Sequence, residues 1–175
     1  MTFPAAPQTR LRAGALRAAL GTFGYTRTDQ SFQTELYSDV AGLAFEVERN
    51  ARYAFNGYVA YESGATPDIK FTLAGPEGAT GQWGFYTLNQ LETGSIGSLE
   101  ALRLDLINDD SQQQGAAGSA SFSSALMCLP RGFIQTAGVG GAVQVRFAQV
   151  TTNASATTVK EGSWLHAWQI EKFSV

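Results

Sequence analysis

Hydrophobic and polar residues alternate along most of the chain from Ser31 onward. The pattern is clearest in Val143–Gln149, where two valines and a phenylalanine occupy every second position. A period of two with β-branched and aromatic residues on one face predicts a strand that packs on a core. A second strand is predicted for Trp164–Ile170, and residues 150–162, which are mostly small and polar, are expected to form a loop between them. These two strands predict a β-sandwich whose C-terminal strand returns to the centre.

Alternation of the same kind predicts the remaining strands. They follow one another at short spacing and are separated by glycine, proline and asparagine turns, which is typical of a sandwich or a jelly roll. The predicted strands are Phe32–Tyr37, Leu43–Val47, Arg52–Glu62, Asp68–Leu73, a segment around Trp83 and Phe85, Ser98–Leu106, and one or two strands within Ser119–Thr136. The predicted fold class is therefore all-β, with residues 31–175 as one domain.

Residues 1–30 have a different character. Thr9 could cap a short helix that ends at Gly21, but Gly14 weakens this interpretation and an extended arm fits equally well. Four arginines against one aspartate give residues 1–30 a charge of +3, whereas the rest of the chain carries −6. A basic arm on an acidic body is expected to dock on a partner, although simple solvation of the arginines explains the same charges.

Composition narrows the function classes. The 175 residues suit one domain, only 15% of them are charged, and the net charge of −3 gives no argument for a nucleic-acid partner. No apolar run has the length of a membrane span, so no membrane partner is expected. The single cysteine, Cys128, excludes an internal disulfide and a multi-cysteine metal site, and its apolar neighbours predict that it is buried.

The sequence offers little for catalysis, and no catalytic residue, cofactor or metal is assigned. His166 lies in a tryptophan-rich strand, where packing is the expected role, and no Gly-x-Ser-x-Gly or phosphate-binding motif occurs. Asp105, Asp109 and Asp110 have oxygen ligands suited to calcium, but their spacing matches no EF-hand loop. Exposed aromatic residues offer one binding function, since Trp83, Phe85 and Tyr86 could stack on a sugar; core packing is the preferred interpretation.

The order of several motifs adds a resemblance. Tyr53–Tyr61, Asp68–Leu73 and Gly75–Gly78, followed near the end by Val145–Gln149 and Gly162–Leu165, resemble strands of short virion proteins of tailed bacteriophages, especially those of actinobacterial hosts. Those proteins are similar in outline to the trimeric C1q/TNF-type jelly roll. The likeness covers residues 42–170 and consists of strand patterns without a catalytic signature.

The resemblance implies a non-enzymatic homotrimer that decorates the phage capsid, assembled in the host cytoplasm and located on the capsid surface of the virion. The N-terminal arm would bind the major capsid protein, and deletion of residues 1–24 is expected to abolish that binding while leaving a folded trimer. The arm contacts are assigned to Arg10, Leu11, Arg12, Leu16, Arg17 and Leu20, and the trimer interface to Tyr58, Phe147, Trp164 and Trp168. The alternative is a tail-fibre or receptor-binding module that recognises a host glycan; the absence of heptad or fibre repeats favours decoration.

Overall fold

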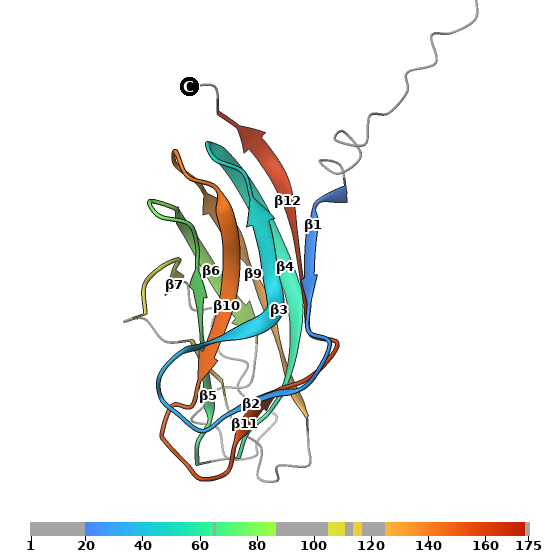
Figure 1. Cartoon of the computed structure of the whole chain (residues 1–175), viewed down its shortest axis with the longest axis vertical. Helices are drawn as coiled ribbons and strands as arrows, with labels where there is room; N and C mark the ends of the chain where they lie inside the picture. Colours follow the sequence, from blue (N-terminus) through green and yellow to red (C-terminus); the bar gives the residue numbers. More distant parts are fainter. Residues whose placement is uncertain (1–19, 65, 87–104, 111–113, 117–124, 174–175) are drawn as a thin grey trace, which may run out of the picture.

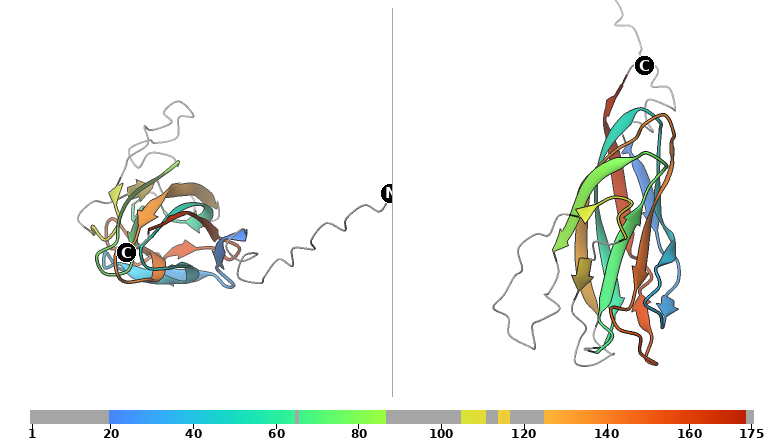
Figure 2. Two further views of the ribbon diagram at one scale, coloured as in Figure 1. Left: turned by 90° about the horizontal axis from the view of Figure 1, so that it is seen from above. Right: turned by 90° about the vertical axis from the view of Figure 1, so that its left-hand side faces the viewer.

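The protein is an all-β sandwich of two antiparallel sheets, seen in a computed structural model that describes residues 20–64, 66–86, 105–110, 114–116 and 125–173 (Figure 1). The two sheets form the two layers of a jelly-roll-like fold, which the view from above shows edge-on (Figure 2). The predicted fold class is confirmed.

The first layer is an eight-stranded sheet, called the large sheet below. Its main path runs β1-β12-β4-β9-β6-β7, and β11 continues the β12 edge of β4 and pairs with β2. The strands are β1 (Thr22–Tyr25), β2 (Gln30–Phe32), β4 (Ala51–Glu62), β6 (Thr80–Tyr86), β7 (Asp105–Leu106), β9 (Leu126–Gln135), β11 (Thr157–Val159) and β12 (Trp164–Lys172).

The second layer, the small sheet, has the order β3-β10-β5-β8. Its strands are β3 (Ser38–Val47), β10 (Gly141–Ala148), β5 (Ile69–Ala74) and β8 (Gln114–Ala116). The two C-terminal strands predicted from the alternating pattern, β10 and β12, therefore lie in different sheets. β12 occupies an inner position between β1 and β4, so the chain does return into the large sheet.

The core fills the space between the sheets with the residues that the period of two places inward. In β4 every second side chain from Tyr53 to Tyr61 is buried, as predicted. β10 shows the same alternation, and Cys128 on β9 is 1% exposed, which confirms its predicted burial. Burying this apolar surface is the main source of stability for such a sandwich.

Three strand predictions were wrong in part. Residues 33–37 form bends and loop, and the strand expected there begins only at Ser38. The predicted loop 150–162 contains β11. The sheet also begins earlier than residue 31, because β1 pairs along its whole length with β12, from Thr22 opposite Ala167 to Tyr25 opposite Trp164.

Because the sheet begins at Thr22, the predicted N-terminal arm of residues 1–30 includes part of the sandwich. A deletion of residues 1–24 would remove most of β1, so it would damage the sandwich as well as the arm. Arg10, Leu11, Arg12, Leu16 and Arg17, together with the predicted helix up to residue 19, lie outside the described residues. Leu20 is described: its side chain is exposed, and its carbonyl oxygen lies 2.8 Å from Nε2 of His166. Within the described residues, no helix is long and apolar enough to cross a membrane.

Candidate functional site

The outer faces of the two sheets differ sharply in chemistry. Ten large hydrophobic side chains are exposed among the described residues, and six of them lie on β1, β9 and β12 of the large sheet. None of the ten lies on β3, β5 or β10 of the small sheet. The six are Phe23, Tyr25, Met127, Phe133, Trp168 and Ile170.

Pairing registers bring the aromatic residues of the large sheet together in rows. Trp164 lies opposite Tyr58 on one side and Tyr25 on the other, whereas His166 lies opposite Phe23. The next row along brings Trp168 and Phe133 to the same side, with Ala54 between them. We call the outward-facing rings of these three rows the aromatic face: Phe23, Tyr25, Tyr58, Phe133, Trp164, His166 and Trp168.

The rings near β1 are packed against one another. The Phe23 ring stacks on Trp164 with 5.8 Å between centroids and 18° between planes, and it lies 6.1 Å from the Tyr25 ring. The ring of His166 is 5.6 Å from Trp168. Such contacts between rings stabilise this arrangement beyond the burial of area.

Gly24 is the reason that β1 can carry two outward aromatic residues. This inward position lies against β3, and a Cβ atom there would overlap the Ala44 carbonyl oxygen. Because side chains alternate along a strand, a glycine facing inward places Phe23 and Tyr25 together on the outer side. The Phe-Gly-Tyr alternation is the signal in the sequence from which this strand and its outward rings could have been predicted.

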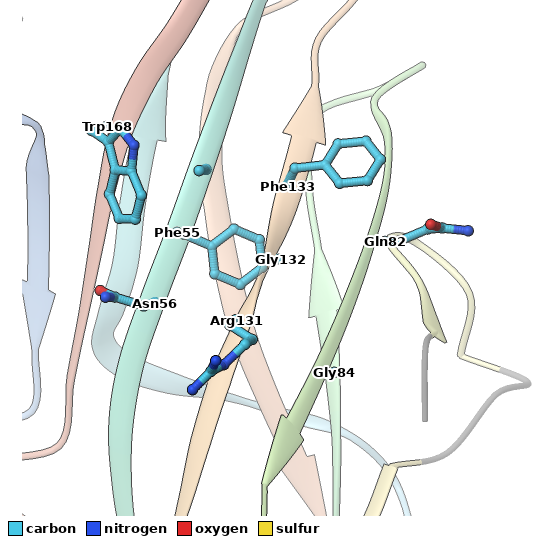
Figure 3. A pocket seen from close by; sticks show the side chains of 9 residues that line it. Phe55, Asn56, Gln82, Gly84, Arg131, Gly132, Phe133 and Trp168 are labelled. Atoms are coloured by element: carbon cyan, nitrogen blue, oxygen red, sulfur yellow. The ribbon is translucent and has the colours of Figure 1, made fainter. Parts of the chain in front are cut away.

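A shallow groove of about 500 Å³ crosses the aromatic face between β12 and β6 (Figure 3). Trp168 lies at one side and Phe133 at the other, and the Phe55 ring shows between β4 and β9 at the bottom. Asn56, Gln82 and Arg131 supply the polar side chains. The remaining lining residues are Ala54, Gly84 and Gly132.

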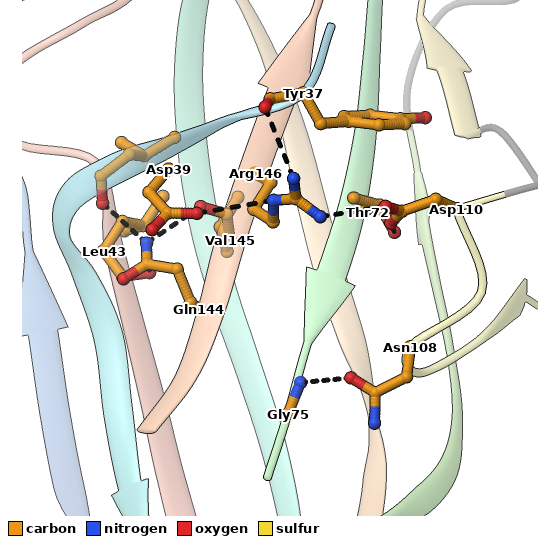
Figure 4. A network of polar contacts seen from close by, with 11 residues as sticks. Tyr37, Asp39, Leu43, Thr72, Gly75, Asn108, Asp110, Gln144, Val145 and Arg146 are labelled. Carbon is orange, nitrogen blue, oxygen red and sulfur yellow. Dashed lines mark hydrogen bonds and ion pairs between the residues drawn. The ribbon is translucent and has the colours of Figure 1, made fainter. Parts of the chain in front are cut away.

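The outer face of the small sheet is charged and internally paired (Figure 4). The Arg146 guanidinium lies 2.9 Å from Oδ2 of Asp110 and 3.4 Å from Oδ1 of Asp39, and it donates a hydrogen bond to the Tyr37 carbonyl. Thr72 donates to the other oxygen of Asp110 at 3.3 Å. Since these groups satisfy one another, the cluster joins β10 and β5 to the segments around Tyr37 and Asp110 and acts as a structural clamp.

The residues that the sequence offered for catalysis and metal binding do not come together in the described part of the chain. His166, the one histidine, packs between the rings of Phe23 and Trp168 and has Nε2 against a backbone carbonyl, which is a packing role. No group of three or more histidine, cysteine, aspartate or glutamate side chains could hold a metal ion within the described part of the chain, Asp105, Asp109 and Asp110 included. Burial raises the pKa of the Cys128 thiol, so it is held in its unreactive neutral form.

The structure separates the predicted interface residues. Tyr58, Trp164 and Trp168 come together on the aromatic face. Phe147 does not join them, because its side chain is fully buried between the sheets with its ring 4.9 Å from that of Phe32. An inward position in β10 cannot contact another chain, so Phe147 is a core residue.

Trp83 cannot take part in the sugar-stacking platform that the sequence suggested. Trp83 is 2% exposed and belongs to the core, as the preferred interpretation had it. The side chains of Phe85 and Tyr86 lie outside the described part of the chain. Residues that no motif in the sequence singled out, above all Phe133, Asn56 and Gln82, form the groove in its place.

Comparison with known proteins does not assign this chain to a family. No family model matches this sequence, and no curated protein matches it significantly.

Proposed function

We propose that this protein is a non-enzymatic structural protein of a phage virion, a homotrimer that decorates the capsid by binding the major capsid protein. The single observation that supports it best is the unequal exposure of apolar surface on the two sheets. Soluble single chains rarely expose a contiguous apolar patch, and one confined to a single face indicates a surface that is covered in an assembly. The virion setting itself comes from the resemblance of the strand motifs.

The contact between copies is assigned to the end of the aromatic face near β1, where the rings of Phe23, Tyr25 and Trp164 pack together. Phe23 is 58% exposed and Tyr25 is 44% exposed, and both lie next to Trp164 on β12, which has Tyr58 of β4 on its other side. Aromatic residues of this kind dominate interface energetics because they bury much area at little cost in conformational entropy. Trp168 lies one row further along β12, at the margin of this contact and on the side of the groove.

The direct test is the oligomeric state of the purified chain. Sedimentation equilibrium of the unaltered protein is expected to give the mass of a trimer, and Phe23→Asp is expected to give a folded monomer because a charge would be buried without a partner. Leu36→Asp is the matched control, since Leu36 is 77% exposed but lies outside the aromatic face. An unaltered protein that sediments as a monomer at all concentrations would contradict the trimer.

The location in the particle needs a second experiment. An antibody against this chain is expected to label phage heads in immunogold electron microscopy. Label confined to the tail would favour the second candidate, a receptor-binding module that recognises host glycan. That module could not use Trp83, which is buried, and would need another surface.

A further inference from the structure

The groove on the large sheet has a shape that the strand register explains. Trp168, Ala54 and Phe133 occupy one row on β12, β4 and β9, and the middle residue contributes only a methyl group. The two aromatic residues are two strand spacings apart, about 9.6 Å. In the next row the position on β6 is Gly84, which has no side chain, so the groove continues towards that strand.

The spacing of Trp168 and Phe133 leaves room for one flat ring of a ligand between them. An aromatic ring contacts another ring at about 4.5–7 Å between centroids, so a ring placed between two aromatic side chains needs about 9–14 Å. The Phe133 ring leans towards β6 and leaves the space beside Trp168 open (Figure 3). The volume of about 500 Å³ lies within the range of about 300–1,000 Å³ that small-ligand sites occupy.

The polar side chains of the groove lie in two rows: Asn56 and Arg131 are in the row next to the aromatic one, and Gln82 is at the β6 end of the aromatic row. Asn56 lies opposite Arg131 in the register, and Gln82 lies opposite Phe133. Neither amide makes a side-chain hydrogen bond within the described part of the chain, and both are exposed. A primary amide offers two donor hydrogens and an acceptor oxygen, which match a hydroxyl group that both donates and accepts.

We propose that this groove binds a glycan, with the C–H face of one hexopyranose unit on Trp168 and a hydroxyl of that unit on Asn56, which lies in the adjoining row on the neighbouring strand β4. A pyranose combines an apolar face with a rim of hydroxyls, and the lining offers two aromatic residues beside three polar side chains in the same way. This site is independent of where the protein sits in a particle, and it differs from the sugar platform around Trp83 that the sequence suggested.

Two other occupants fit the chemistry less well. A nucleotide would bring phosphate charge, and Arg131 is the single cationic side chain of the lining. A side chain from a second copy of this protein would cover the apolar part but leave Asn56 and Gln82 buried without partners, which costs free energy.

The experiment is a titration of the full chain with four soluble tetrasaccharides built from glucose (β-linked and α-linked), mannose and N-acetylglucosamine. Isothermal titration calorimetry is the readout for the unaltered protein and every variant, since it does not depend on the tryptophans that the variants change. We expect at least one sugar to bind with a dissociation constant in the millimolar range or tighter. Trp168→Phe is then expected to weaken binding about tenfold and Asn56→Ala to weaken it by a similar factor, near 1.4 kcal/mol each.

Met127→Ala is the control, since Met127 is an exposed side chain on the same strand and face as Phe133 but outside the groove. The proposal is overturned if none of the four sugars binds at about 10 mM, a concentration above the weakest expected dissociation constant. It is equally overturned if Trp168→Phe or Asn56→Ala binds as the unaltered protein does. Dissociation of the oligomer by Trp168→Phe would assign the groove to a second copy, and this result is distinct from failure of the Phe23→Asp test.

Discussion

The Tyr37 ring lies under two cations, with Nζ of Lys70 5.2 Å and the guanidinium carbon of Arg146 5.7 Å from its centroid. Burial raises the pKa of Tyr37 to about 12, and the negative charges of Asp110 and Asp105 add to the effect. Its hydroxyl is buried, and no group in the described part of the chain forms a hydrogen bond with it. The ring of Tyr37 therefore stabilises the protein through its contacts with the two cations, whereas the buried hydroxyl destabilises it.

We predict that Tyr37→Phe leaves the free energy of unfolding at neutral pH unchanged or raises it by up to about 1 kcal/mol, because an unsatisfied buried group is removed. Tyr53→Phe is the matched control. Oη of Tyr53 accepts a hydrogen bond from the Glu48 backbone N–H at 3.0 Å, so this variant is expected to lose about 1 kcal/mol. Urea unfolding measures both values, and a clear loss for Tyr37→Phe would show that the hydroxyl has a stabilising partner.

The same residue gives the protein a pH dependence. Because the pKa of Tyr37 is raised in the folded state, the unfolded chain ionises first, near pH 10, and stability falls from there until about pH 12. Tyr37→Phe is predicted to flatten that decline in urea unfolding curves recorded across this range. An identical decline in the variant would assign it to other groups.

At the scale of elements, β3 depends on a bulge. Its register against β10 shifts between Gln144 and Arg146, and the side-chain amide of Gln144 donates to the Val40 and Leu43 carbonyls on the opposite strand. Gly42 adopts φ +82°, and a Cβ atom there would lie 2.5 Å from the Tyr25 carbonyl oxygen. A bulge with a left-handed glycine bends the strand and carries it past β1.

We predict that Gly42→Ala destabilises the protein by about 1–3 kcal/mol, because the left-handed backbone and the close oxygen both oppose a side chain. Gly138→Ala is the control: no heavy atom lies within 4 Å of its Cβ position and its φ is not in the left-handed region. Thermal unfolding compares the two variants. Equal melting temperatures would mean that the bulge can relax at no cost.

The bulge also explains why some strands could be predicted from the sequence and others could not. Strands with an unbroken period of two, such as β4, β5 and β10, were predicted nearly to the residue. In β3 the consecutive residues Ala41 and Gly42 are both exposed, which breaks the period and hid the first half of the strand. β11 has only three residues, and its pairing with β2 and β4 arises from tertiary contacts that no local pattern reveals.

At the scale of the whole molecule, the alternating pattern predicted most of the strands. It did not predict which of their apolar side chains face outward, or on which sheet. Phe147 and Trp164 both lie in alternating strands close to the C-terminus, but one faces the core and the other faces outward. The difference follows from the pairing of β10 with β3 and β5 and of β12 with β1 and β4. The candidate surface could be assigned only after these long-range registers placed the outward residues side by side.

Docking on the capsid and contact between copies should be separable, because they are assigned to different parts of the chain. We predict that reversing the charge of the arm, with Arg10, Arg12 and Arg17 each changed to Glu, leaves the trimer intact and lowers capsid binding at least tenfold. Charge reversal is preferable to deletion of residues 1–24, which would remove most of β1. The expected loss follows from multivalency: in the proposed trimer, three arms would raise the effective concentration of a weak contact, so weakening every arm would act three times.

The measurement is co-sedimentation of each purified variant with capsids that lack this protein, and Arg49→Glu on the exposed turn after β3 serves as the control. Phe23→Asp supplies the converse case, since a monomer with an intact arm should bind weakly but measurably. Equal capsid binding by the arm variant and the unaltered protein would move the docking surface to the sandwich. In that case the aromatic face would have to serve the capsid instead of a second copy, and Phe23→Asp would abolish binding outright.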